Sequence, residues 1–128
     1  MTDTSYHENL LRFTDDLFEA GKDRQPFEEA LEAALEAHGI HYDDRTDIVA
    51  RERYDYGIVK SFYWTPTEGG QQAGAVTSGG LNVLLRVDRS TRPACSMWEV
   101  NRDGVPWRLI GRYPTVNAAV AERNLVAP

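Results

Sequence analysis

Cysteine is almost absent from the sequence: Cys95 is the only one, so the chain cannot form an internal disulfide. No stretch approaches the roughly 18 to 20 apolar residues that a membrane span requires. The N-terminal residues lack the basic segment and apolar run of a secretory leader. These absences lead us to expect a protein outside the membrane, in a reducing, cytoplasmic compartment.

Catalytic and metal-binding signatures are also missing. The three histidines are His7, His38 and His41. The last two have aspartates close by, but Gly39 should break the helix between them, and closed zinc sites rely on Cys or on better-spaced His. A nucleophilic thiol needs a base and an electropositive setting, so we interpret Cys95 as a packed strand residue. We expect no enzymatic activity, no cofactor and no metal.

Charge is distributed unevenly along the 128 residues, whose formal net charge is −6. Residues 1–56 hold 15 acids and 6 bases, residues 57–80 hold one of each, and residues 81–128 hold 4 acids and 7 arginines. A chain of this length predicts one domain, with an acidic helical part at 1–56 and the sheet and last helix at 57–128. The asymmetry indicates either an interaction surface or two halves that pack against each other.

Helical periodicity dominates the first part of the chain. Residues 5–8, with the sequence SYHE, have the form of a capping box, and apolar residues follow at the spacing of one helical face until Gly21. A second helix is predicted from Pro26, a residue favoured in a first turn, to a stop at Gly39. The short connection favours an antiparallel helical hairpin.

The following residues change to the two-residue alternation of strands. Residues 40–56 fit a short helix capped by Asp44, which we favour, or a brief strand. Strands are predicted at 58–64 and at 81–88. One face of the second strand carries Leu81, Val83, Leu85 and Val87.

The segment 67–80 between these strands contains five glycines. It has no Gly-Lys-Ser/Thr and no G-x-G-x-x-G before a helix, so it matches neither phosphate-loop pattern. We expect a long, flexible connector or a loose extension of a hairpin, with a loop that becomes ordered on a partner as a further alternative.

Asp103-Gly104 is the clearest turn signal, because this pair is typical of a two-residue type I′ hairpin. Such a turn fixes the register of both flanking strands. The resulting pairs are Val100 with Trp107 and Trp98 with Leu109 on the face that we assign to the core, and Glu99 with Arg108 and Met97 with Ile110 on the outer face.

Pro114 and Thr115 are expected to open a final helix from Val116 to about Val126. Helices followed by a meander of strands predict an α+β fold. It should consist of the N-terminal helical hairpin with a short third helix, an antiparallel sheet of about four strands, and the C-terminal helix.

The first candidate binding surface is an acidic ridge on the second helix. Glu28, Glu32 and Glu36 follow one another at i, i+4 spacing, where like charges cost roughly a few tenths of a kcal/mol per pair. The ridge indicates a docking surface for a basic protein patch, or an ordinary solvated face. The candidate protein-binding residues are Glu28, Glu29, Glu32, Glu36, Asp43, Asp44 and Asp47.

The second candidate surface is basic and lies in the predicted sheet. Its residues are Arg86, Arg108 and Arg112. Arginine pairs with phosphates and aromatic rings stack on bases, so with Trp98 and Trp107 nearby these strands could hold nucleic acid. Three points oppose this: both tryptophans are assigned to the core face, Glu99 and Asp88 interrupt the basic row, and the whole chain is acidic.

A third candidate is apolar. Met97 and Ile110 on the outer face of the hairpin, with Leu84 on a neighbouring strand, would form a homodimer or partner interface if they are exposed. They belong to the core if helices cover both faces of the sheet.

The leading hypothesis is a non-enzymatic protein-binding module, an inhibitor or adaptor, whose acidic helical surface binds a protein with a basic, nucleic-acid-binding patch. Phage and other mobile elements use small acidic chains of this kind against host defence complexes, and anti-CRISPR activity is one case. The alternative is a nucleic-acid-binding protein that uses the Arg-bearing antiparallel sheet.

Overall fold

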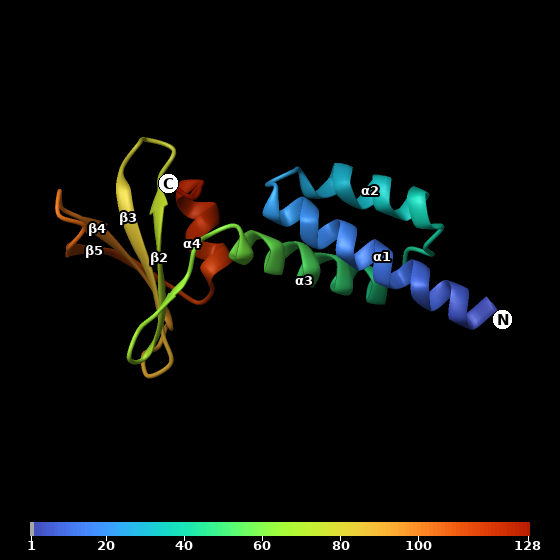
Figure 1. Ribbon diagram of the computed structural model, residues 1–128, viewed down its shortest axis with the longest axis horizontal. Coiled ribbons are helices and arrows are strands. Elements are labelled where there is room, and N and C mark those ends of the chain that lie inside the picture. The colour runs from blue at the N-terminus through green and yellow to red at the C-terminus, as the bar shows by residue number, and fades with distance from the viewer. Residues whose placement is uncertain (1) are drawn as a thin grey trace. The chain divides into compact units, whose positions relative to one another are not determined.

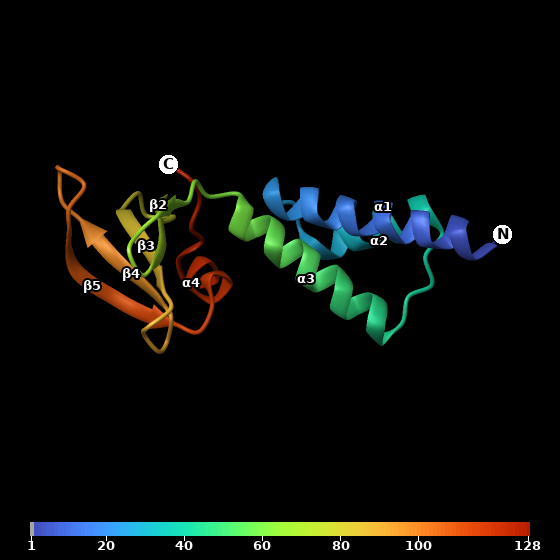
Figure 2. The same cartoon turned by 60° about the horizontal axis from the view of Figure 1, so that its bottom comes forward.

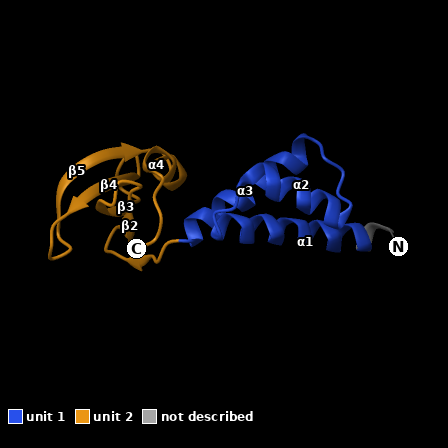
Figure 3. Ribbon diagram, turned by 90° about the horizontal axis from the view of Figure 1, so that it is seen from above, with its two compact units in different colours: residues 1–61 blue, residues 62–128 orange. Residues whose placement is uncertain are grey.

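The computed structural model describes residues 2–128, with side chains from residue 5 onward. The chain divides into two compact units, Met1–Ser61 (unit 1) and Phe62–Pro128 (unit 2), coloured separately in Figure 3. Unit 1 contains three helices, and unit 2 contains an antiparallel sheet followed by a fourth helix (Figure 1). The predicted α+β fold is therefore confirmed, with five strands instead of about four.

Unit 1 is built from α1 (Thr2–Lys22), α2 (Phe27–His38) and α3 (Asp44–Lys60). Both α2 and α3 pack against α1. Their apolar faces meet in one core cluster, which consists of Phe13, Leu17, Leu31, Ala34, Ile40 and Ala50. The predicted second helix is confirmed, with Gly39 in the left-handed conformation (φ 61°) as its C-cap.

Two predictions about helix ends in unit 1 are wrong. Helix α1 begins at Thr2, so Ser5 lies inside the helix and does not cap it. Helix α3 exists as favoured, but its N-cap is Asp43, whose carboxylate accepts from the Thr46 N–H. The predicted strand at 58–64 is also wrong, because α3 continues to Lys60 and the first strand begins only at Thr65.

Gly57 explains why α3 continues through a segment that resembled a strand. A Cβ at this position would overlap the backbone oxygen of Phe18 and lie 3.0 Å from the Cα of Gly21. The two glycines therefore let α1 and α3 approach each other backbone to backbone. Glycine occurs at these two helical positions because the close packing between the helices leaves no room for a side chain.

Unit 2 contains β1 (Thr65–Pro66), β2 (Gly70–Val76), β3 (Asn82–Asp88), β4 (Cys95–Val100), β5 (Pro106–Tyr113) and α4 (Val116–Arg123). The strands form one antiparallel sheet in the order β1-β2-β3-β4-β5. The predicted flexible connector at 67–80 is wrong and the alternative of a hairpin extension is confirmed, because strand β2 lies inside this segment and pairs with β3 along its whole length. Its Gly70 sits where a Cβ would overlap the carbonyl oxygen of Val87, so this glycine marks close strand packing.

Helix α4 covers one face of the sheet and packs against β4 and β5 (Figures 1 and 2). Direct cross-strand pairing places Leu85 opposite Met97 and Val87 opposite Cys95. Met97 is completely buried and Cys95 is 1% exposed, so this is the core face. The assignment of Met97 to the outer face was wrong, because alternation within one hairpin does not reveal which face a helix will cover.

The hairpin between β4 and β5 keeps the predicted register only in its middle. The pairs Trp98 with Leu109 and Glu99 with Arg108 are confirmed. Register shifts on either side pair Met97 with Gly111 and Val100 with Pro106, so the two outer predicted pairs are wrong. The strands are joined through Asn101, whose Oδ1 accepts from two backbone N–H groups of the loop, and through Gly104 at φ 78°.

The last helix begins as predicted, since the Thr115 hydroxyl accepts from the Ala118 N–H at its N-cap. It ends at Arg123, earlier than expected, because Asn124 takes the left-handed conformation (φ 50°). The chain then returns to the sheet, where Val126 pairs with Val76.

Candidate functional site

Helix α4 covers one face of the sheet, and we call the opposite face the open face. Among the described residues of unit 2, no helix covers the open face. Direct pairing across four strands sets two neighbouring rows of side chains on it. The polar row is Gln72, Arg86, Ser96 and Arg112. The apolar row is Gly74, Leu84, Trp98 and Leu109. Together the seven residues with side chains beyond Cα form what we call the open-face patch.

Trp98 lies at the centre of the open-face patch and is held in place by polar contacts. Its indole N–H donates to the Ser96 hydroxyl at 2.9 Å. The guanidinium carbon of Arg86 lies 6.0 Å from the centre of the indole ring, at the outer limit of a cation–π contact. Arg86 also donates to the Gln72 side-chain oxygen at 3.4 Å, so ring and cation are oriented together.

Arg112 is exposed and makes no ion pair with any residue that the structure describes. It lies across Ser96 from Arg86, two strand spacings away, which corresponds to about 10 Å. Leu109 beside it is 39% exposed. The patch therefore combines two cations with uncovered apolar surface, the half-buried indole of Trp98 included.

Arg108, the third basic candidate, is separated from the other two. It lies opposite Glu99 on the face that α4 covers, and both its Nε and Nη2 approach a Glu99 carboxylate oxygen at 2.7 Å. Its guanidinium carbon is 5.7 Å from the ring centre of Trp107, which is 60% exposed at the irregular end of β5. The charge of Arg108 is thus already neutralised by Glu99, and Arg108 lies outside the open-face patch.

Charge divides between the two units. Unit 1 holds 15 acids and 7 bases, whereas unit 2 holds 5 acids and 7 arginines. The sheet unit is therefore weakly basic although the whole chain is acidic. Among its acids, Asp88 at the end of β3 accepts from the N–H and the hydroxyl of Ser90, and these hydrogen bonds lower the pKa of its carboxyl group.

The acidic candidates of unit 1 fall into two groups. The four glutamates of α2 are exposed, and only Glu28 has a basic neighbour, Arg51, at 3.9 Å. Asp43 caps α3, and hydrogen bonds from Thr46 lower the pKa of its carboxyl group. Asp47 accepts from the Tyr42 hydroxyl and from Arg51, which lowers its pKa in the same way.

Asp43 and Asp47 thus serve the fold, and Asp44 is exposed beside them. Among the described residues, Glu29, Glu32 and Glu36 have no ion-pair partner. These three glutamates are the part of the predicted acidic surface that is left to interact with something else.

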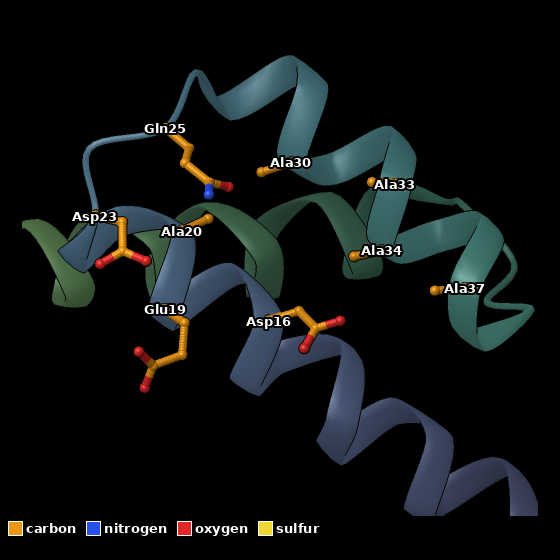
Figure 4. Close-up of a pocket in the computed structure, with 9 residues that line it drawn as sticks. All are labelled: Asp16, Glu19, Ala20, Asp23, Gln25, Ala30, Ala33, Ala34 and Ala37. Carbon is orange, nitrogen blue, oxygen red and sulfur yellow. The ribbon is translucent and has the colours of Figure 1, made fainter.

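A shallow groove of about 280 Å³ between α1 and α2 extends this acidic surface (Figure 4). No pattern in the sequence predicts this groove. Its floor is made of alanines from both helices, Ala20, Ala30, Ala33, Ala34 and Ala37. The carboxylates of Asp16, Glu19 and Asp23 line its α1 side. Asp16 is also 2.7 Å from His38 Nε2, so one lining carboxylate connects α1 to the last residue of α2.

Metal-binding geometry does not occur among the described residues, where no three His, Cys, Asp or Glu side chains gather closely enough to hold an ion. His38 is engaged with Asp16, and His41 is exposed. Burial raises the pKa of the Cys95 thiol to about 11, as expected for a packed strand residue. No helix in the described part of the chain is both long and apolar enough to cross a bilayer.

No protein-family model, curated protein or solved structure matches this chain. The function therefore has to be inferred from the open-face patch and the acidic surface themselves.

Sequence reasoning found the two arginines of the patch but missed its central residues. It assigned Trp98 to the core and did not consider Gln72 or Ser96. The missing signal was the register between β3 and β4, in which the apolar Leu85 and Val87 match Met97 and Cys95. Matching those pairs would have placed Trp98 on the opposite face.

Proposed function

We propose that this protein is a non-catalytic nucleic-acid-binding protein that uses the open-face patch. The observation that carries the proposal is the arrangement of Arg86 and Arg112 around Trp98 on a sheet face that no helix of unit 2 covers. Guanidinium groups pair with phosphates, and an indole offers a surface on which a base can stack.

The folded chain answers most of the objections from the sequence. Trp98 lies on the uncovered face and Glu99 lies on the opposite face with Arg108, while Asp88 remains a charged carboxylate at the end of β3, outside the patch. The acidity of the chain is concentrated in unit 1, while arginines outnumber acids in unit 2. These findings favour nucleic acid as the ligand of the sheet.

A binding assay with arginine variants tests this function. We expect the full chain to bind fluorescently labelled nucleic acid at low salt, and the R86A/R112A double variant to bind about tenfold more weakly, since each lost phosphate contact removes electrostatic attraction. Arg123→Ala is the control. Arg123 lies on α4, outside the open face, so the loss of its charge should leave affinity unchanged. Equal binding by the double variant and the native chain would refute the proposal.

A second candidate function rests on the three unpaired glutamates of α2 and on the carboxylate-lined groove beside them. Such a surface suits a partner protein with a basic patch, one that ordinarily binds nucleic acid, and unit 1 would then act as an inhibitor or adaptor. Anti-defence proteins of the anti-CRISPR type are one class that acts in this way.

Capture from a nuclease-treated host lysate tests this second function. A stoichiometric protein partner should be lost from the E29Q/E32Q/E36Q variant because its attraction is electrostatic. It should be retained by E8Q/E52Q/E68Q, which removes the same charge from other exposed positions. A partner that both variants retain equally would show that the α2 surface is not its docking site.

A further inference from the structure

We infer that the open-face patch selects single-stranded over double-stranded nucleic acid, with a base stacked on Trp98 and phosphates held by Arg86 and Arg112. This inference rests on the proposed function and names the form of its ligand. Its basis is the order of the two rows, apolar beside polar, on one continuous face.

The apolar row is the feature that separates the two forms. A duplex presents phosphates on its outside and keeps the faces of its bases stacked inside, so Leu84, Trp98 and Leu109 would find no apolar partner on it. A single strand can turn an unstacked base onto an aromatic ring. The row therefore contributes to binding only when the bases are free.

The polar row supplies the matching backbone contacts. Arg86 is oriented by Gln72 and lies beside Ser96 in the row, and Arg112 projects from β5 with no ion-pair partner in the described chain. Ser96 between them is 5% exposed and is occupied by the Trp98 indole N–H. A strand of nucleic acid that follows this row would place phosphates at Arg86 and Arg112, on either side of Ser96, and a base over Trp98.

The small number of cations also argues against a duplex ligand. Two phosphate contacts give little of the electrostatic attraction on which duplex binding depends. The acidic residues concentrated in unit 1 add none. Stacking, which depends weakly on salt, must then provide the larger part of the affinity.

The test uses the full chain and three labelled probes: a 12-nucleotide oligo(dT), a 12-nucleotide oligo(U) and a 12-base-pair duplex of mixed sequence. Fluorescence anisotropy should give at least tenfold tighter binding of one or both single strands than of the duplex. The logarithm of the binding constant should fall with the logarithm of salt concentration at a slope of about −1.4, as two phosphate contacts on a single strand require.

Variants then separate the two kinds of contact. Trp98→Ala should weaken single-strand binding about tenfold with no change in the salt slope, and Trp98→Phe should restore most of the affinity because it keeps an aromatic ring. Arg112→Ala, at an exposed position, should halve the slope to about −0.7. Arg123→Ala should leave both affinity and slope unchanged.

Each contrary result has a distinct meaning. A duplex that binds as tightly as the single strands, or single-strand binding that Trp98→Ala does not affect, overturns the single-strand inference and leaves nucleic-acid binding in place. Failure of all three probes to bind overturns both the single-strand inference and the proposed nucleic-acid-binding function. A dimer that Trp98→Ala dissociates, together with that failure, would assign the patch to a second copy of the chain.

Discussion

At the scale of single residues, glycine has opposite meanings in sequence and in structure. Gly57 falls between a predicted helix and a predicted strand, and Gly70 falls within the predicted flexible connector, yet one lies inside α3 and the other begins β2. In each case a neighbouring backbone occupies the space of the missing side chain. These glycines are therefore requirements of packing, and substitution tests that directly.

Gly57→Ala should destabilise unit 1 by about 2 kcal/mol, because the added methyl group overlaps the Phe18 carbonyl and forces α1 and α3 apart. Urea unfolding followed by circular dichroism at 222 nm measures this. Glu52→Ala, an exposed position on the same helix, is the control and should change stability little. A Gly57→Ala variant as stable as the native chain would mean that the helices separate at no cost.

At the scale of secondary-structure elements, the sequence predicted what local signals encode. The helix stop at Gly39, the cap at Thr115 and the central register of the β4–β5 hairpin are all confirmed. Strand β2 and the end of α3 were missed because their glycines are explained only by partners distant in sequence. The central residues of the open-face patch were missed for the same reason, since its membership depends on pairing between strands.

The contact between β5 and α4 has a pH dependence of its own. Tyr113 donates a hydrogen bond to Glu122, and burial together with this carboxylate raises the pKa of the Tyr113 phenol to about 12. A tyrosine in an unfolded chain titrates near 10. The raised value means that the native state favours the neutral phenol, so its contribution to stability is complete below about pH 10 and is lost as pH rises toward 12.

Tyr113→Phe should therefore remove part of the loss of stability between about pH 10 and 12, since phenylalanine cannot ionise. At neutral pH the variant should be less stable by about 1 kcal/mol through the lost hydrogen bond. Denaturant midpoints measured at pH 8, 10 and 11 for both proteins give the comparison. Parallel declines in the two proteins would place the sensitive group elsewhere.

At the scale of the whole molecule, the two compact units can be followed by separate spectroscopic signals. All three tryptophans, Trp64, Trp98 and Trp107, belong to unit 2. Most helical residues belong to α1, α2 and α3 of unit 1. Tryptophan fluorescence therefore reports on the sheet, and circular dichroism at 222 nm reports mainly on the helices.

We expect the two signals to give separate urea unfolding curves, because each unit has its own core. Gly57→Ala should lower the midpoint of the dichroism curve by about 1 M urea and leave the fluorescence curve in place. Coincident curves that shift together in this variant would instead identify one cooperative domain, which is what the length of the chain predicts.

The irregular pairing of β4 with β5 has one more consequence, for the behaviour of the protein at high concentration. Strand β5 forms an outer edge of the sheet, and unpaired edges can recruit strands from other molecules into aggregates. Two register shifts distort this edge, Pro106 at its start lacks an N–H, and the charged side chains of Arg108 and Arg112 project from it. Such features discourage the pairing of strand edges between molecules. The open face of the sheet can then bind a ligand while the β5 edge resists polymerisation.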